Sequence, residues 1–280
     1  MNIRTVTLAT LGVLGVARVS VAQEPGGELP GIAYGDTVTG VLAPAGDTLS
    51  NGTYYRQYLL TGKGGDAVTI SLSSSDFNAN LLLLDAIDAD YVLAGDDNSG
   101  GDCNSHLTTT LPAAGRYTII AHGSAPNEIG SFVLSVREGA QPPASTQPCR
   151  GFSDPQGILQ PGDTVRGAIG PEDRTLPRDG THYQVWVLAP VPGRTVSIDL
   201  VSSDFDATLF LVRGMSEVIA ANDDGGGGCN ARLVYTAEED RPYRFVTRAA
   251  PGGAVGSFEL TVSEGAKPVM QDSTCQPSGP

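Results

Sequence analysis

Two acidic loops carry the residue types in this sequence that could bind a cation. One contains Asp96 and Asp97, and the other contains Asp223 and Asp224 beside a run of four glycines. Calcium takes six to eight oxygen ligands and tolerates irregular loops. Together with the acidic residues that precede the loops, the candidate calcium ligands are Asp76, Asp96, Asp97, Asp204, Asp206, Asp223 and Asp224.

A structural role for these side chains is the alternative. Asp and Asn accept hydrogen bonds from nearby backbone amides and thereby cap turns. A cysteine ends each acidic loop, so a disulfide would fix the loop without a cation. The sequence favours turn caps over calcium ligands and keeps calcium as the one cofactor it suggests.

Four aromatic residues outside the obvious core segments could contact a ligand. Tyr55 and Tyr58 occupy the same positions in one half of the chain as Tyr183 and Trp186 do in the other. Exposed aromatic rings are favoured contacts in recognition surfaces. The more common arrangement is a half-buried ring on the face of a sheet.

Catalysis has little support in the residue pattern. His106, His122 and His182 do not recur at matching positions, and the chain contains neither His-Glu-x-x-His nor Gly-x-Ser-x-Gly. We therefore predict a non-catalytic protein. A hydrolase that uses paired carboxylates ranks behind both a binding protein and a purely structural module.

A duplicated domain positions these residues. Residues 74–81 return at 202–209, residues 35–40 return at 162–167, and residues 130–136 return at 256–262. The offset stays between 126 and 128, which indicates the tandem duplication of a whole domain.

The segments of each copy are typical of β-strands. Val68, Ile70 and Leu72 alternate with polar residues, and the same alternation recurs at 196–200 and at 258–262. Turns rich in Gly, Pro and Asp separate these segments. The sequence predicts an all-β protein made of two tandem, jelly-roll-like antiparallel β-sandwich domains.

Four cysteines predict two disulfides. Cys103 and Cys149 are 46 residues apart, and so are Cys229 and Cys275. Of the three ways to pair four cysteines, Cys103–Cys149 with Cys229–Cys275 alone treats both copies alike and keeps each bridge inside its domain.

The first 22 residues are typical of an export signal. Arg4 precedes a short apolar run, and Ser20-Val21-Ala22 is a small-x-small cleavage site. We therefore expect a secreted or periplasmic protein that has no membrane span. The predicted divisions are a signal at 1–22, a leader at 23–30, repeat 1 at 31–149, a linker at 150–156, repeat 2 at 157–275 and a tail at 276–280.

The net charge is −14, and it becomes −16 when Arg4 and Arg18 leave with the signal. A surface of this sign repels nucleic acid and anionic lipid. We therefore expect no nucleic-acid partner. The oligomeric state and the arrangement of the two domains are not determined by the sequence.

The order of the motifs resembles the bacterial pre-peptidase C-terminal domain family, to which the collagen-binding modules of clostridial collagenases are related. The resemblance covers nearly all of the chain after the signal. It implies a β-sandwich that often accompanies a secreted hydrolase. It rests in repeat 1 on Asp76-Phe77-Asn78, Leu81, Asp96-Asp97, Gly100-Gly101, Asn104, Gly115-Arg116-Tyr117 and Gly130-Ser131-Phe132, and in repeat 2 on Asp204-Phe205-Asp206, Leu209, Asn222-Asp223-Asp224, Gly225 to Gly228, Asn230, Tyr243 and Gly256-Ser257-Phe258.

The chain departs from the collagenase relatives at one calcium-binding position. Where those relatives place an Asp before the aromatic strand, this chain has Tyr54 in one copy and His182 in the other. The sequence therefore predicts an exported binding or accessory protein that adheres to an extracellular polymer or a secreted protein. The alternative is a structural or secretion-assisting module without a ligand of its own.

Overall fold

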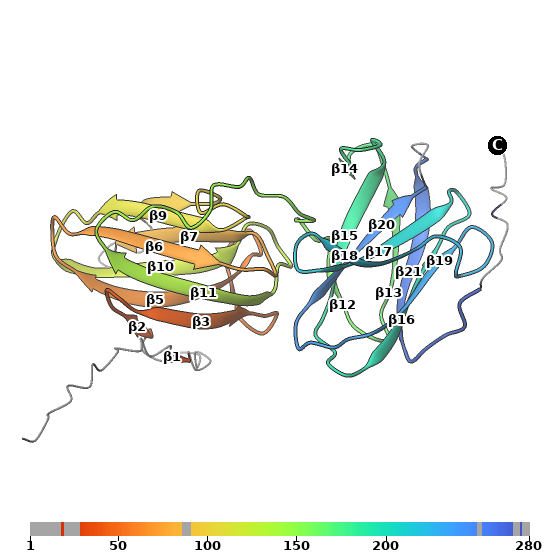
Figure 1. The fold of residues 1–280 in the computed structure, drawn as a ribbon, viewed down its shortest axis with the longest axis horizontal. Helices are drawn as coiled ribbons and strands as arrows, with labels where there is room; N and C mark the ends of the chain where they lie inside the picture. The colour runs from red at the N-terminus through yellow and green to blue at the C-terminus, as the bar shows by residue number, and fades with distance from the viewer. Residues whose placement is uncertain (1–17, 20–28, 86–90, 251–253, 271–274, 276–280) are drawn as a thin grey trace, which may run out of the picture.

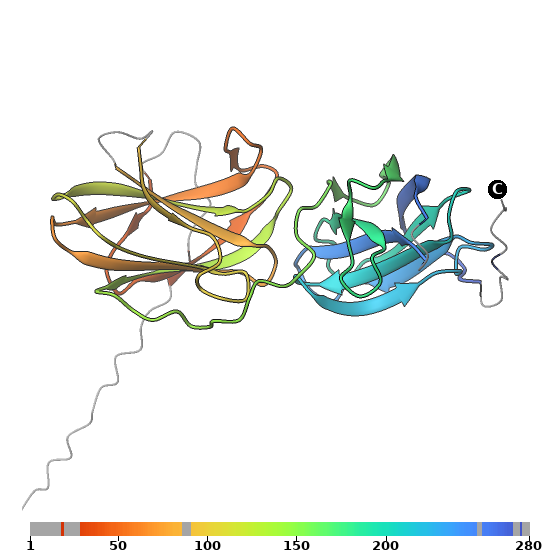
Figure 2. The same ribbon diagram turned by 90° about the horizontal axis from the view of Figure 1, so that it is seen from above.

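The computed structural model describes residues 18–19, 29–85, 91–250, 254–270 and 275. The protein is all-β, as the sequence predicts, and it forms two β-sandwiches that lie side by side along the long axis (Figures 1 and 2). Within the described part of the chain, no helix is long and apolar enough to cross a membrane. The predicted cleavage site lies outside the described residues.

The first sandwich contains two sheets that face each other, and their strands are antiparallel except where β1 and β2 join them. One sheet has the order β3-β11-β6-β9, and the two-residue strand β1 pairs with β3 in parallel. The other sheet has the order β2-β5-β10-β7-β8, and β4 pairs with β5. The strands are β1 (Arg18–Val19), β2 (Gly31–Ile32), β3 (Thr37–Leu42), β4 (Asp47–Thr48), β5 (Tyr54–Gly62), β6 (Ala67–Ser73), β7 (Ala79–Asp85), β8 (Val92–Asp96), β9 (Ser105–Thr110), β10 (Gly115–Gly123) and β11 (Gly130–Glu138).

Apart from β1, which has no counterpart there, the second sandwich repeats the topology of the first. Its sheets have the orders β13-β21-β16-β19 and β12-β15-β20-β17-β18, and β14 pairs with β15. The strands are β12 (Ile158–Leu159), β13 (Thr164–Ile169), β14 (Arg174–Thr175), β15 (His182–Leu188), β16 (Thr195–Val201), β17 (Ala207–Arg213), β18 (Glu217–Asn222), β19 (Ala231–Thr236), β20 (Tyr243–Ala249) and β21 (Gly256–Glu264).

Each sandwich has its own hydrophobic core, and the repeated glycine and phenylalanine motifs meet there. Gly40 lies against the ring of Phe132, where an added Cβ would come within 2.2 Å of the ring. Gly167 lies against Phe258 in the same way, at 2.6 Å. A side chain at either glycine would displace a buried ring, which explains why both copies have glycine at this position.

Both predicted disulfides are present. Cys103 is bonded to Cys149, and Cys229 is bonded to Cys275. Each disulfide joins the loop after β8 or β18 to the segment that follows the last strand of its sandwich. Disulfides are typical of proteins of the periplasm or the extracellular space.

Candidate functional site

The repeated Ser-Ser-Asp-Phe motif forms a turn that joins two strands. The Ser74 hydroxyl accepts hydrogen bonds from the backbone amides of Asp76 and Phe77, at 3.0 and 3.2 Å, and donates to the carbonyl of Ser131. The Asp76 carboxylate accepts the amide of Ser131 at 2.8 Å. This part of the predicted cation site therefore serves as a turn cap in repeat 1.

The second copy makes the same bonds. Ser202 accepts the amides of Asp204 and Phe205, and the Asp204 carboxylate accepts the amide of Ser257 at 2.8 Å. The hydrogen bond from the Ser257 amide, followed by one from the Ser203 hydroxyl, lowers the pKa of Asp204. Because both copies use this aspartate in the same bond, its conservation between them is explained by the fold.

The first residue of each acidic loop is also a structural cap. The Asp96 carboxylate accepts the amides of Ser99 and His106, at 3.2 and 2.7 Å. In the second copy Asn222 occupies this position and accepts the amides of Gly225 and Arg232, at 2.7 and 3.0 Å. An amide oxygen performs the same function as a carboxylate here, so the position does not require a negative charge.

In repeat 2 the charges of Asp223 and Asp224 act on Asp206, but among the described residues the ligand atoms within 4.8 Å of one another are those of Asp206, Cys229 and Cys275. Burial, then the neighbouring charges of Asp224 and Asp223, raises the pKa of Asp206. One carboxylate oxygen of Asp206 is inaccessible to water and accepts no hydrogen bond from a described residue. Cys229 and Cys275 lie beside it but are bonded to each other, so they offer no thiolate to a metal.

Repeat 1 lacks part of this cluster. Asn78 occupies the position of Asp206, and Asn98 occupies that of Asp224. Asp97 corresponds to Asp223; burial and the charge of Asp96 raise its pKa. Oxygen atoms suited to a cation therefore concentrate in the second copy.

Three of the four predicted ligand-binding aromatics are buried. Tyr58 is 2% exposed, Tyr183 is 8% exposed and Trp186 is 7% exposed. Trp186 contacts Phe258 edge to face, and Tyr58 contacts Phe132 in the same manner. Tyr55 remains half-buried, so these rings mainly pack against the sandwich.

The histidines lie apart from one another. His106 contacts the hydroxyl of Ser71 at 2.9 Å through Nδ1, and its Nε2 lies 2.7 Å from the carbonyl of Gln141. His122 and His182 each contact a backbone carbonyl, that of Gly123 and that of Asp173 respectively. The group behind the His106 ring is the Gln141 carbonyl in place of a carboxylate, and neither Ser71 nor His106 lines the groove at the contact between the domains.

The two sandwiches are joined by an ion pair that the sequence analysis did not anticipate. Arg241 of repeat 2 pairs with the Asp76 carboxylate of repeat 1 and also donates to the Ser75 hydroxyl at 3.0 Å. The Asp76 side chain is 4% exposed and that of Arg241 is 20% exposed. Asp76 therefore caps a turn in its own sandwich and binds the other one.

A second arginine is buried at the same contact. The Arg244 side chain is 1% exposed, donates to the backbone carbonyl of Asp76, and lies 3.7 Å from the Glu128 carboxylate, which is fully buried. Burial raises the pKa of Glu128, although the Arg244 charge and hydrogen bonds from backbone amides oppose the shift. Burial likewise lowers the pKa of Arg244, against the opposing charge of Glu128.

These interface residues differ between the copies. The position of Arg244 is Thr118 in repeat 1, and the position of Glu128 is Ala254 in repeat 2. Arg241 corresponds to Gly115. Glu128 is therefore present only in repeat 1, and Arg241 and Arg244 are present only in repeat 2. The positions at which the two copies differ would have pointed to these residues.

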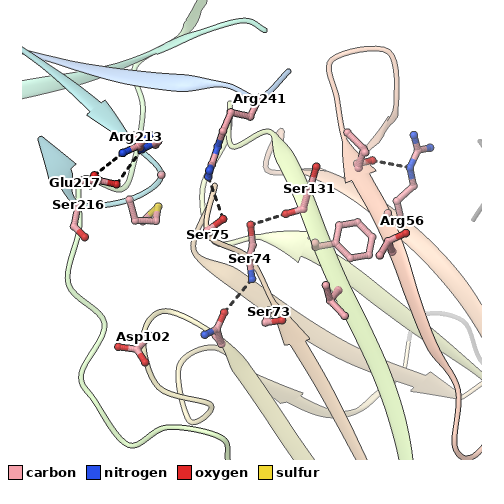
Figure 3. Close-up of a pocket in the computed structure, with 18 of the residues that line it drawn as sticks. Arg56, Ser73, Ser74, Ser75, Asp102, Ser131, Arg213, Ser216, Glu217 and Arg241 are labelled. Atoms are coloured by element: carbon pink, nitrogen blue, oxygen red, sulfur yellow. Dashed lines mark hydrogen bonds and ion pairs between the residues drawn. The ribbon is translucent and has the colours of Figure 1, made fainter. Parts of the chain in front are cut away.

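A groove of about 1400 Å³ lies beside this interface (Figure 3). Its floor includes outward-facing side chains of β3, β11 and the end of β6 in repeat 1. Residues 213–217 and Arg241 of repeat 2 line another side, and residues 147, 148 and 150 contribute as well. The groove therefore requires both sandwiches and the segment between β11 and β12.

The floor of the groove combines hydroxyl groups with small apolar groups. Ser131, Val133 and Ser73 are exposed on it, and Val41 is 50% exposed. Val133 is paired with Ser73 on one side in the sheet, and Ser131 is paired with Val41 on the other. The aromatic residues of the lining, Tyr58 and Phe132, are buried at 2% exposure.

No protein-family model matches the chain. No curated protein matches it either.

Solved structures with similar arrangements include the pre-peptidase C-terminal domain of collagenase from Bacillus anthracis, at 16% identity and a TM-score of 0.32, over 41% of this chain and 100% of that one. They also include the Aeromonas hydrophila PliG, a periplasmic inhibitor of g-type lysozyme, at 16% identity and a TM-score of 0.29, over 39% of this chain and 98% of that one. The CUB1-EGF-CUB2 domains of rat MASP-1 are 9% identical at a TM-score of 0.23, over 84% of this chain and 100% of that one. Similarities at these TM-scores support no argument about function.

Proposed function

We propose that the chain is an exported, non-catalytic binding protein and that the groove between its sandwiches is its ligand site. The observation that carries this proposal is the groove itself, which both domains line. Its volume of about 1400 Å³ exceeds the roughly 300–1,000 Å³ of small-molecule pockets. An extracellular polymer or a secreted protein is a partner of suitable size.

The buried contact between the domains supports this site. Binding costs less free energy when the site is already organised before the ligand arrives. Arg241 and Arg244 hold the repeat 2 side of the groove against Asp76 and Glu128 of repeat 1. The site therefore needs no domain closure to form.

A substitution that fills the groove tests the proposal, and the duplication supplies its control. Ser131 is exposed on the groove floor, and Ser257 is the exposed residue at the same position of repeat 2. The unmodified protein, Ser131→Trp and Ser257→Trp are applied to an array of collagens, other secreted proteins and glycans. We expect a ligand that the unmodified protein and Ser257→Trp retain and that Ser131→Trp loses.

If Ser131→Trp still binds the ligand, the binding site lies outside the groove. If the unmodified protein retains nothing on the array, the structural or secretion-assisting role becomes the better account.

The acidic cluster of repeat 2 supports a second, separate proposal. Asp206, Asp223 and Asp224 would move closer together to share a calcium ion there. A cation would relieve the repulsion that raises the pKa of Asp206 and would give a ligand to its unpaired oxygen. Melting with calcium, with a chelator and with sodium at equal ionic strength tests this proposal.

A further inference from the structure

The ionic groups around the groove are unevenly paired. Arg213 binds Glu217 at 2.7 Å, and Arg241 binds Glu239 at 3.2 Å in addition to Asp76. Both carboxylates that repeat 2 contributes to the groove, those of Glu217 and Glu239, are therefore already in ion pairs.

Two other arginines of the groove have no carboxylate partner among the described residues. Arg56 of β5 donates from Nε to the backbone carbonyl of Val41 at 3.1 Å, so the rest of its guanidinium remains available. Arg150, at the start of the linker, is exposed, and no described group accepts from its side chain. Asp102 is the one acidic residue of the lining without an ion pair in the described part of the chain.

The corresponding face of repeat 2 has different chemistry. Gln184 stands at the position of Arg56, and Gln276 stands at that of Arg150. Val133 of the groove floor corresponds to Glu259, whose carboxylate lies 2.9 Å from Arg166. The groove therefore has two unpaired arginines and a floor without carboxylates, and the corresponding face of repeat 2 has neither feature.

The groove thus offers two arginines without a carboxylate partner against one carboxylate without an ion pair, Asp102. Arg56 and Arg150 each present guanidinium N–H groups, which bind carboxylates with directional, charge-assisted bonds. The exposed Val41 and Val133 suit small apolar groups between them. Oxygen-bearing anionic groups on an extended backbone would satisfy both features.

The net charge limits how anionic the ligand is. The chain after the predicted signal carries −16, so a polyanion such as nucleic acid or heparin would be repelled by the surrounding surface. One or two carboxylates that reach the arginines directly would interact within a Debye length, about 8 Å at physiological salt. A sparsely acidic ligand fits better than a densely charged one.

The lining also favours a polypeptide over a sugar chain. Sugar rings commonly stack on exposed aromatic faces, but Tyr58 and Phe132 are buried beneath the groove floor. Hydroxyls, valines and arginines instead match the alternating side chains of an extended peptide.

We propose that the groove binds an extended polypeptide segment of another protein through carboxylates that pair with Arg56 and Arg150. This inference rests on the proposed function, because it names the ligand class of the same groove.

Peptide titration tests the proposal. The probes are ten-residue Ser/Val/Thr peptides with two aspartates separated by two to six positions, and their controls have asparagine in place of aspartate. Binding is measured by calorimetry with the full chain. We expect at least one aspartate peptide to bind about tenfold more tightly than its asparagine counterpart, which corresponds to about 1.4 kcal/mol.

Variants taken from the other copy locate the contact. Arg56→Gln with Arg150→Gln removes the two arginines, and Arg166→Gln with Arg178→Gln removes the same charge from repeat 2. We expect the first pair to reduce affinity about tenfold and the second pair to leave it unchanged. Because Arg56 is half-buried, Arg56→Lys and the single Arg150→Gln change are measured as well, and unchanged melting confirms folding.

Three outcomes would overturn this inference. Equal binding of aspartate and asparagine peptides would remove the role of the carboxylates. Unchanged affinity in the Arg56→Gln, Arg150→Gln pair would place the contact elsewhere. Binding of oligogalacturonate that depends on these arginines, without binding of the peptides, would identify an acidic glycan as the ligand. In that last case the array ligand would still depend on Ser131, and the proposed function would stand.

Discussion

Arg244 of the second sandwich lies 3.7 Å from Glu128 of the first, and both side chains are withdrawn from water. Neither group has an equivalent in the other copy, where the residues are Thr118 and Ala254. Two buried charges cost desolvation free energy, and they are tolerated when they face each other. We therefore expect the pair to favour this one arrangement of the two domains.

The first prediction concerns this ion pair. We expect Arg244→Thr or Glu128→Ala to lower the free energy of unfolding by about 3 kcal/mol, because each change leaves an uncompensated buried charge. The double variant should lose clearly less than the sum, because no charge is then left alone. Urea unfolding of the four proteins measures the coupling, and additive losses would show that the two groups do not interact.

The second prediction concerns the association of the sandwiches. Each has its own core and disulfide, so we expect residues 23–152 and 153–280 to fold when they are expressed separately. We also expect a chain cleaved at a protease site engineered into linker 150–156 to stay together during gel filtration. Arg241→Gly with Arg244→Thr should let the halves separate after cleavage. Separation of the otherwise unmodified halves would show that the linker alone holds them.

The third prediction concerns the disulfides. Removing Cys103–Cys149 or Cys229–Cys275 by alanine substitution should lower stability by up to about 4 kcal/mol, because each disulfide closes a long loop in the unfolded chain. Only the first should loosen the groove, where the Asp102 amide donates to the Gln147 carbonyl at 2.9 Å.

Hydrogen exchange at the Asp102 amide measures this loosening. The Cys229–Cys275 variant serves as the control. Equal protection of the Asp102 amide in both variants would show that the Cys103–Cys149 disulfide does not stabilise the groove. Mass spectrometry of non-reduced peptides checks the disulfide pairing itself.

The fourth prediction concerns Asp206 and pH. Its pKa is raised in the folded state, so the folded chain binds this proton more tightly than the unfolded chain does. The resulting stability is present below the ordinary pKa of about 3.9 and is lost as the pH rises through the raised value. Without calcium at pH 7, Asp206→Asn should therefore be more stable than the unmodified protein, by less than about 1 kcal/mol after solvent screening.

Calcium should reverse this order. It should stabilise the unmodified protein by about 2.7 kcal/mol at a hundredfold excess over its dissociation constant, but not Asp206→Asn or the Asp97→Ala, Asp224→Ala variant. Melting curves with calcium and with chelator measure the difference. Identical curves for the unmodified protein would leave these carboxylates without a cation.

Features that depend on short segments or on the duplication can be predicted from the amino-acid sequence. Alternating residues such as Val68, Ile70 and Leu72 predicted strands, and the structure has β6 there. The equal spacing of the cysteines predicted Cys103–Cys149 and Cys229–Cys275. These predictions succeeded because strand periodicity is local and because a duplicated domain repeats its disulfide.

The roles of the acidic residues and the location of the groove depend on how the strands and the two domains pack in three dimensions. Asp76 and Arg241 are 165 residues apart, and no local pattern relates them. Asp96 is a cap because its carboxylate meets the amide of His106 on another strand. Hydrogen-bond partners and burial depend on how strands and domains pack together. This packing brings residues that are distant in the sequence into contact, and such a contact leaves no periodic pattern in the sequence around either residue.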